Sequence, residues 1–376
     1  MKYMLTILFL SLLSATAIRS IQSILTDVAT DDIFVQSQKL SVTPPAKLNL
    51  TGIIAVSKDE LWAIGNEIRT GRTPQGKATI ISNSLLMVSQ NGGQSWETRL
   101  ILSDTFFSQI YLLNSGDAWI LGDHGLAIRS QDGGRIWKPQ NIPIESLLID
   151  LQFVSASRGW ILSVDGTMIQ TQDKGEKWVP CTSDSEYKFA SFTFKDEANG
   201  WAIAKNGTLY QTTNGGNTWQ SRTADYRKIM NIPDEKDLVF QSIKAVNTKE
   251  IFFFAESRSK GEIIAKETIM FQSKDGGETW RSKRVSPTKG VLRAYIVNEK
   301  DIWIVPRERY TDYLLRTTDG WKTFEEVKLP TECNPNSFYF LNSQVSWFIR
   351  STDDFSSTSI FSTIDGWKTS KRITIQ

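Results

Sequence analysis

Cysteine and histidine are nearly absent from this sequence. Its 376 residues include two cysteines and one histidine. Two cysteines cannot form a disulfide framework or a four-thiolate zinc site, and one histidine excludes every mechanism that needs two. Long apolar runs are also missing beyond the first residues, so we expect no membrane-spanning helix in the rest of the chain.

The chain also lacks an excess of either charge. Lys and Arg number 43 and Asp and Glu 41, which leaves a net charge of +2. This balance excludes a strongly polycationic nucleic-acid binder, so we expect no nucleic-acid partner. Apolar residues make up 40 % of the chain, which is typical of a globular protein.

The first residues have the pattern of an export signal. A basic start is followed by an apolar run from Met4 to Leu13 and by the small residues Ala15-Thr16-Ala17. We expect a signal peptide at residues 1–17 and a leader or linker at 18–47, with an uncleaved anchor as the alternative. The remaining protein is then exported to a periplasm or secreted, without insertion into a membrane.

One phrase of eight residues, Ser/Thr-x-Asp/Asn-x-Gly-x-x-aromatic, recurs along the chain. Its eighth position falls at 96, 137, 178, 219, 280, 324 and 370, so the first three steps are 41 residues each. The last two copies have Trp in place of the second glycine, and the last copy has no final aromatic. The third position is Asn91, Asp132, Asp173, Asn214, Asp275, Asp319 and Asp365.

A second aromatic lies upstream of each phrase, at the start of a short apolar stretch. These residues are Trp62, Trp119, Trp160, Trp201, Phe252, Trp303 and Trp347. Together with the phrases they account for all 13 tryptophans, so tryptophan in this protein belongs to the repeat and is expected to pack in the core.

One repeat contains four short strands. Residues 189–222 show the pattern. The first strand has alternating aromatics, and the next three are Trp201 to Ala204, Thr208 to Thr212 and Thr218 to Arg222. Turns separate them, one of which is Asn206-Gly207. Four antiparallel strands per unit are typical of a propeller blade. We predict an all-β protein, a seven-bladed β-propeller over residues 48–376 with the phrase between strands three and four; an open solenoid is the alternative.

The phrase itself is suited to a turn. Its Asp or Asn accepts hydrogen bonds from backbone amides, and glycine permits positive φ. One carboxylate per turn is far from the six to eight oxygens of a calcium site. We therefore assign these residues a structural role and expect no metal and no cofactor.

The phrase resembles the Asp-box, or bacterial neuraminidase repeat. The stretches from Gly159-Trp160 to Trp178 and from Gly200-Trp201 to Trp219 resemble the photosystem II stability/assembly factor family of seven-bladed propellers. The resemblance implies a non-catalytic scaffold whose partner is a protein such as a membrane-protein assembly intermediate. It also implies a thylakoid lumen location if the source is photosynthetic.

The extra length of the chain falls on one face of the predicted ring, where second-to-third-strand loops and blade connections lie. Loops on a rigid scaffold often carry binding sites, so we hypothesise that a protein partner docks here on a monomer. Solvated loops are the alternative, because acidic residues dilute the charge. The candidate residues are Arg69, Arg72, Tyr226, Arg227, Lys228, Arg258, Lys260, Arg307, Arg309 and Tyr310.

The innermost strands carry a second set of candidates for an axial channel or ligand pocket. The alternative is that they pair with one another or contact water. They are Tyr111, Asp150, Lys244, Arg293, Tyr295 and Tyr339.

A secreted glycoside hydrolase of sialidase-like or xyloglucanase-like type is the alternative function. The Arg-Ile-Pro motif of sialidases is absent, and Asp150 is the only acid that we place on an innermost strand. His124 is expected in a hairpin turn. Cys181 and Cys333 lie in connections on nearly opposite sides of the ring, too far apart for a disulfide.

Overall fold

A computed structural model describes most of the repeat region, residues 47–72, 78–103, 105–114, 116–181, 188–221, 236–247, 249–259, 267–285, 291–298, 300–306, 311–333, 335–351 and 358–374. The expected signal peptide and almost all of the leader lie outside these residues and stay predictions. Within them, no helix has the length and hydropathy to cross a membrane.

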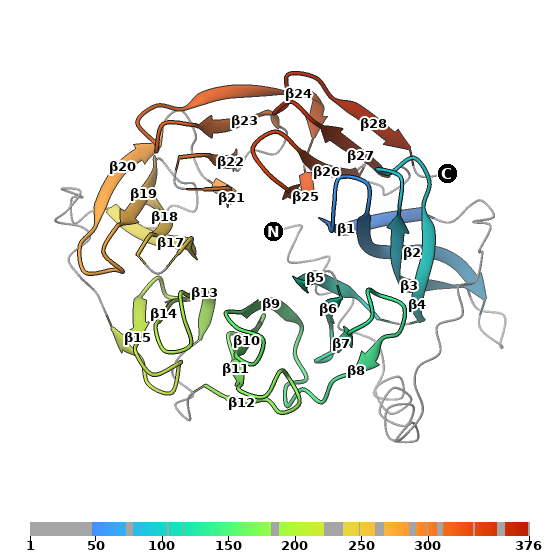
Figure 1. Cartoon of the computed structure of the whole chain (residues 1–376), viewed down its shortest axis with the longest axis horizontal. Helices are drawn as coiled ribbons and strands as arrows, with labels where there is room; N and C mark the ends of the chain where they lie inside the picture. Colours follow the sequence, from blue (N-terminus) through green and yellow to red (C-terminus); the bar gives the residue numbers. More distant parts are fainter. Residues whose placement is uncertain are drawn as a thin grey trace.

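Seven four-stranded antiparallel sheets surround a common axis, so the predicted seven-bladed propeller is confirmed (Figure 1). Blade one comprises β1 (Lys47–Ala55), β2 (Leu61–Arg72), β3 (Ala78–Ser89) and β4 (Glu97–Ser103). Blade two comprises β5 (Phe107–Asn114), β6 (Asp117–Gly122), β7 (Ala127–Ser130) and β8 (Lys138–Pro139). Blade three comprises β9 (Leu148–Phe153), β10 (Gly159–Ser163), β11 (Met168–Thr171) and β12 (Val179–Pro180).

Blades four to seven repeat this order. Blade four comprises β13 (Phe189–Phe194), β14 (Gly200–Ala204), β15 (Leu209–Thr212) and β16 (Gln220–Ser221). Blade five comprises β17 (Lys236–Ala245), β18 (Ile251–Ser259), β19 (Glu267–Ser273) and β20 (Arg281–Val285). Blade six comprises β21 (Val291–Ile296), β22 (Ile302–Pro306), β23 (Thr311–Thr317) and β24 (Glu325–Cys333), and blade seven β25 (Pro335–Phe340), β26 (Ser346–Ser351), β27 (Thr358–Thr363) and β28 (Lys371–Thr374).

Each blade is built from four strands that are consecutive in the sequence, with the first strand nearest the axis (Figure 1). The second strand is buried on both faces, as in β10 and β14, where every residue is buried. Such strands are apolar throughout because each face packs against a neighbouring blade. The fourth strands of blades two to four have only two residues, shorter than the sequence predicts for blade four.

The phrase forms the turn between the third and fourth strands and has one hydrogen-bond pattern. In blade two, the Ser130 hydroxyl donates to Asp132 Oδ1 (2.8 Å) and accepts from the Gly134 amide (2.8 Å). The Ile136 amide donates to Asp132 Oδ1 (2.9 Å). Blades one and seven, for example, repeat these bonds, so the Ser or Thr and the Asp or Asn define the turn.

These turns lie on the same face as the first-to-second-strand turns. The amide of Gly92 donates to Asp59 O (2.8 Å), and the amide of Gly215 donates to Ala198 O (2.7 Å). We call this side, formed by the phrases and the first-to-second turns, the box face. The opposite side, formed by second-to-third connections and blade-to-blade connections, is the loop face.

The hydrophobic core lies between blades. Second-strand aromatics and box residues of the next blade share clusters, for example Trp119 of β6 with Trp178 after β11. The second box glycine leaves room for this packing, because a Cβ on Gly134 would lie 2.5 Å from the Trp62 ring. Gly134 also has a φ of 78°, which favours glycine.

Candidate functional site

Two predicted loops of the loop face are largely sheet. Arg69 and Arg72 were predicted in a second-to-third-strand loop, but β2 and β3 pair from Leu61↔Ser89 as far as Arg72↔Ala78. Likewise, β18 continues to Ser259, and Arg258 pairs with Asp237 of β17. Residues 66–72 lengthen the β2–β3 ladder, because antiparallel pairing satisfies their backbone groups.

The predicted partner-binding residues are only partly placed. Arg69, Arg72 and Arg258 lie in β2 and β18, but their side chains are outside the described part of the structure. The other predicted residues lie wholly outside it: Tyr226, Arg227, Lys228, Lys260, Arg307, Arg309 and Tyr310. Their grouping into one docking surface stays a prediction.

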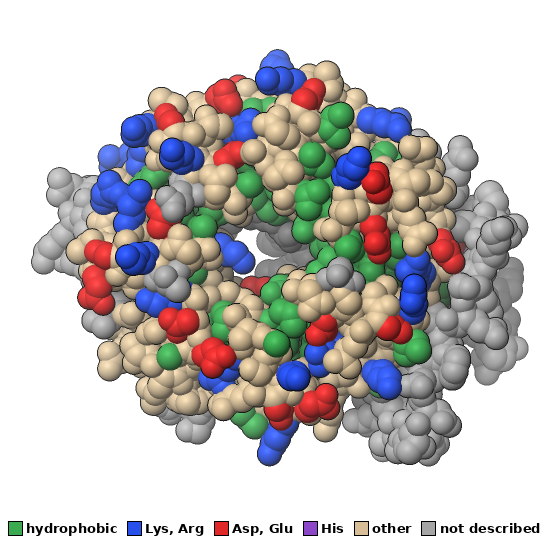
Figure 2. Space-filling model, viewed as in Figure 1, with side chains coloured by type: hydrophobic (Ala, Val, Ile, Leu, Met, Phe, Trp, Pro, Cys, Tyr) green, Lys and Arg blue, Asp and Glu red, His purple; other side chains and the backbone are tan. Residues whose placement is uncertain are grey.

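The predicted axial residues all belong to innermost strands. The ring has a central opening with apolar side chains around it, while charges of both signs are scattered over the face in view (Figure 2). Lys244 of β17 is exposed and Asp150 of β9 is half-buried. The side chain of Arg293 of β21 is outside the described part. Whether these groups bind a ligand stays a prediction.

The axial tyrosines are half-buried, and two of them join neighbouring blades. Tyr111 of β5 accepts a hydrogen bond from the Phe153 amide of β9 (3.4 Å), and Tyr295 of β21 accepts one from the Phe338 amide of β25 (3.2 Å). Burial raises the pKa of Tyr111, which the Phe153 bond lowers and nearby Asp150 raises further. Burial also raises the pKa of Tyr339. The Tyr111 hydroxyl is therefore protonated at neutral pH. Through these hydrogen bonds Tyr111 and Tyr295 each connect two neighbouring blades.

Other residues on the innermost strands also form hydrogen bonds between neighbouring blades. Gln152 of β9 donates to Phe194 O (2.8 Å) and accepts from the Phe194 amide (2.9 Å). Thr193 of β13 accepts from the Ala245 amide (3.0 Å). Sequence reasoning missed these joints, because a single Gln or Thr on a strand has no distinguishing spacing.

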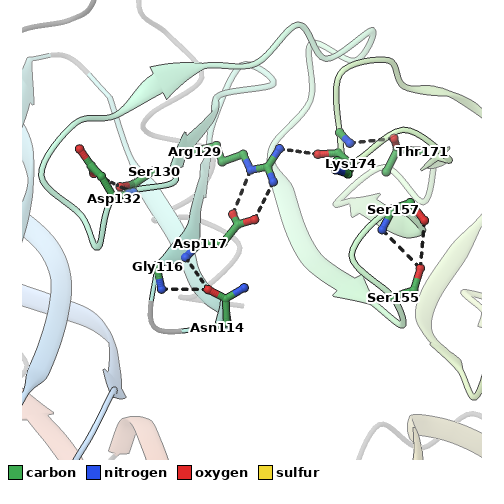
Figure 3. Close-up of polar contacts among 11 residues, drawn as sticks. Asn114, Gly116, Asp117, Arg129, Ser130, Asp132, Ser155, Ser157, Thr171 and Lys174 are labelled. Atoms are coloured by element: carbon green, nitrogen blue, oxygen red, sulfur yellow. Dashed lines mark hydrogen bonds and ion pairs between the residues drawn. The ribbon is translucent and has the colours of Figure 1, made fainter.

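The box face holds buried arginines that the sequence analysis did not select. In blade two, Arg129 of β7 forms a two-point ion pair with Asp117 of β6, at 2.9 and 2.6 Å (Figure 3). The guanidinium lies 5.1 Å from the Trp119 ring centroid and also donates to the Lys174 carbonyl of blade three (Figure 3). Asp117 thus compensates the buried charge of Arg129, and Arg129 joins blades two and three.

Blade six repeats the arrangement. Arg316 of β23 pairs with Asp301 at 3.1 and 2.9 Å, lies 4.5 Å from the Trp303 ring and donates to the Ser343 carbonyl of blade seven (3.3 Å). The signal in the sequence is an acid two residues before the second-strand Trp and an Arg opposite that Trp. It is recognisable only once the strand register is known.

Blade three differs, because the position of the acid holds Arg158 and the position of the arginine holds Gln170. Arg158 is 6 % exposed and stacks 5.0 Å from the Trp160 ring. Its Nη2 donates to Gln170 Oε1 (2.6 Å) and to the Gly215 carbonyl of blade four (3.1 Å). Burial lowers the pKa of Arg158, whereas electrostatic interactions with Cys181 and Glu197 raise it. Arginine nevertheless stays charged at neutral pH.

A shallow polar hollow of about 380 Å³ opens beside Arg158, between blades three and four. It is lined by Ser157, Arg158, Gln172, Glu197, Ala198, Asn214 and Asn217. Glu197 is exposed and accepts a hydrogen bond from Ser155 (2.8 Å). The described residues contain no group of three or more His, Cys, Asp and Glu side chains that could hold a metal ion.

Two further predictions concern single residues. His124 lies in the β6–β7 turn with a φ of 50°, as expected for a turn residue. Cys181 is a buried free thiol between β12 and β13, and burial raises its pKa. The side chain of Cys333 lies outside the described part, so that thiol is not placed.

Comparison with known proteins places this propeller among its relatives. A family model for photosynthesis system II assembly factor YCF48 matches residues 135–222, from the box of blade two to the end of blade four. Among solved structures, YCF48 bound to a D1 peptide has a TM-score of 0.57 at 15 % identity, covering 82 % of this chain and 94 % of that chain. YCF48 from Cyanidioschyzon merolae has a TM-score of 0.54 at 18 % identity, with the same coverage of both chains.

A glycosidase shares the fold as well. The GH74 xyloglucanase from Xanthomonas campestris has a TM-score of 0.53 at 11 % identity, covering 86 % of this chain and 54 % of the enzyme. A search of curated proteins finds no match. At such identities the solved structures establish the fold alone, whereas the family model recognises the sequence of the repeats. The chain is a seven-bladed propeller that resembles the photosystem II assembly factor family, in sequence over residues 135–222 and in fold over most of its length.

Proposed function

We propose that this protein is a non-catalytic scaffold that assists assembly of a membrane-protein complex by binding a protein partner on its loop face. The match of residues 135–222 to the YCF48 model carries the proposal. A solved YCF48 structure that holds a D1 peptide gives the partner chemistry, a polypeptide segment. The proposal places the protein in an exported compartment, in line with the expected signal peptide.

The loop face offers a protruding element to such a partner. Strands β2 and β3 each have 12 residues, compared with four to six in β6, β7, β10 and β11. The β2–β3 hairpin therefore extends past the body of blade one and carries Arg69 and Arg72 on a paired ladder. Backbone that is already paired in a sheet loses less conformational entropy on binding than a free loop, which favours binding.

A hydrolase is the competing proposal, supported only by the shared fold with GH74 enzymes. Glycoside hydrolysis needs a pair of carboxylates on either side of the scissile bond. Asp150, the inner-strand acid selected from the sequence, accepts a hydrogen bond from the Leu151 amide at Oδ1 (2.9 Å). The expectation that it is the only such acid was wrong, because β17 also contains Asp237. Turnover of chromogenic glycosides that is abolished in Asp150→Asn would establish this alternative instead.

The decisive experiment is a binding titration with a D1 peptide, followed by capture from membranes of the source organism. The variant Arg69→Ala/Arg72→Ala/Arg307→Ala/Arg309→Ala should lose at least about tenfold in affinity, because interface arginines are frequent hot spots. The same variant should fail to capture the partner from membranes.

A matched control removes four cations from the opposite side. Lys58, Arg135, Lys322 and Lys368 are exposed on the box face, and their joint replacement by Ala changes the net charge equally. Unaltered binding in the control together with weakened binding in the loop-face variant supports the proposal. Equal affinity in both variants and in the parent protein contradicts it.

A further inference from the structure

The box-face arginines separate into two kinds. Arg129 and Arg316 each have a carboxylate within 3 Å, supplied by Asp117 and Asp301. Arg158 is as buried as Arg129, at 6 % and 5 % exposure, yet within the described part of the chain no carboxylate oxygen lies within ion-pair distance of it. Its fixed contacts are neutral: the Gln170 amide oxygen, the Gly215 carbonyl and the Trp160 ring.

The hydrogen-bond donors of Arg158 show where an anion fits. Nη2 is used twice, and Nε is buried without a partner. Nη1 makes no hydrogen bond to the described residues and is not among the buried unpartnered atoms, so it is the nitrogen that reaches the hollow. Glu197 acts on the charge of Arg158 only at a distance, without a hydrogen bond or ion pair. A buried cation without a paired counter-ion is unfavourable, and an anion that enters the hollow relieves that cost.

The surroundings of Nη1 favour a small singly charged group. Ser157, Gln172 and Asn217 line the hollow with neutral polar side chains, and Arg158 is the only cation among the lining residues. Glu197 on the rim repels anions, which disfavours a doubly charged phosphate more than a carboxylate. A carboxylate also matches the planar guanidinium edge.

We propose that the hollow at Arg158 is a carboxylate-binding site for a partner polypeptide, which inserts either an acidic side chain or its chain end. The site lies on the box face, so it is separate from the loop-face surface and does not depend on it. A partner that contacts both faces would be held at two points on opposite sides of the ring.

The test titrates isotope-labelled full chain with three probes and follows the backbone amides of Ser157, Gly215 and Asn217 by NMR. N-acetylglycine carries a chain-end carboxylate, N-acetylaspartate α-methylamide carries a side-chain carboxylate, and N-acetylglycinamide is the neutral control. Saturable shifts with an acid and none with the neutral amide support the site. The acid that binds more tightly identifies the source of the carboxylate.

Variants decide whether Arg158 is responsible. Arg158→Gln should weaken acid binding by at least about tenfold, as loss of a charge-assisted hydrogen bond predicts. Arg135→Gln, an exposed cation of the same face, should leave it unchanged. Glu197→Gln removes the repelling charge and should tighten binding about two- to fivefold, and it keeps the test valid if Arg158→Gln does not fold.

Three results overturn the proposal. They are equal shifts with acids and neutral amide, shifts that grow without saturation, and acid affinity that is insensitive to Glu197→Gln. Any of them would mean that Arg158 only joins blades three and four, in which case Arg158→Gln lowers the melting temperature and nothing else.

Discussion

The boxes of blades three and six differ at the fifth position of the phrase, which is a glycine in blade three and a tryptophan in blade six. Gly175 has a φ of 93° and Trp321 a φ of 63°. Both amides donate to the threonine that opens the turn, at 2.9 Å in each case. The Thr and Asp side chains therefore fix this turn, and the glycine is not required for it.

The neighbouring blade decides which residue fits. In blade three, a Cβ on Gly175 would lie 2.5 Å from the Trp119 ring of blade two. For the box of blade six, the neighbouring residue equivalent to Trp119 is Phe252 of blade five. The Trp321 indole packs in the same cluster as Phe252 and donates to Gln272 Oε1 (3.0 Å). Positive φ costs Trp about 1–2 kcal/mol, which burial of a large aromatic outweighs.

Blade seven finds another solution. Trp367 also has positive φ, at 69°, although Trp303 of blade six is retained. Its ring packs 5.1 Å from the Phe348 ring of its own blade, and its Nε1 has no hydrogen-bond partner. The joint between blades six and seven thus keeps both tryptophans, and within the described residues neither the Trp303 nor the Trp367 indole donor has a hydrogen-bond partner.

The largest effect is expected from carrying the blade-six residue into blade three. Gly175→Trp places an indole where the Trp119 ring already lies, so we expect loss of cooperative unfolding in a thermal melt followed by near-UV circular dichroism. Gln172→Trp, on the exposed side of the same turn, is the control and should melt like the parent. A normal melt for Gly175→Trp would show that the joint repacks freely.

The ion pair of blade two should be the next most sensitive. Asp117→Asn leaves Arg129 buried without its carboxylate, and we expect a loss of about 3–5 kcal/mol in the free energy of unfolding. Urea denaturation measures it, with exposed Glu176→Gln as control. A loss below about 1 kcal/mol would place Arg129 with Arg158, as a guanidinium held by neutral contacts.

The reverse exchange in blade six should cost less. Trp321→Gly loses about 3–5 kcal/mol of aromatic packing but relieves the unfavourable φ, so we expect a net loss of about 2–3 kcal/mol. Adding Phe252→Trp rebuilds the joint of blade three and should recover part of the loss in urea denaturation. Strictly additive effects would show that the two positions do not share space.

The smallest effect concerns acid stability, where boxes with Asp differ from boxes with Asn. Hydrogen bonds from the Thr279 hydroxyl and amide and from Ser273 lower the pKa of Asp275 from 3.8 to about 2. A carboxyl group whose pKa is lower in the folded state stabilises the folded protein at pH values above its pKa in the unfolded state. The contribution of Asp275 is therefore present above pH 3.8 and disappears as the pH falls towards about 2.

Asp275→Asn, which imitates Asn91 and Asn214, should therefore flatten the fall in melting temperature between pH 4 and pH 2. The change should be slight because the carboxylate is almost fully exposed to solvent. Glu278→Gln in the same turn is the control. An unchanged acid profile in Asp275→Asn would show that the box carboxylates do not set acid stability.

The sequence predicts the fold well because its signals are local and repeated. Gly159 to Trp178 contains a complete second strand, turn, third strand and box. Hydrogen bonds within the box join side chains two residues apart, or a side chain and a backbone amide four residues apart. Strand ends were less predictable. Residues 66–72 pair with β3 through backbone groups that any residue provides, so no side-chain signal marks them as strand.

The site was harder to predict than the fold. Arg158 looks in the sequence like any turn arginine before Gly-Trp, and its burial follows from the Gly215 turn, 57 residues later, which closes over it. Such contacts between blades depend on the ring as a whole. Conversely, the arginines chosen for docking follow from loop length alone, a criterion that identifies exposed segments but not their partners.

Since each blade uses four consecutive strands, blades seven and one are neighbours in the ring although they are not consecutive in the sequence. Side-chain packing between β1 and β25 to β27 closes the joint between them, together with a hydrogen bond from Thr358 to Leu48 O. Under mechanical load on its ends the molecule should open at this seam first. For the same reason, its termini can be relocated to another joint without cutting a sheet.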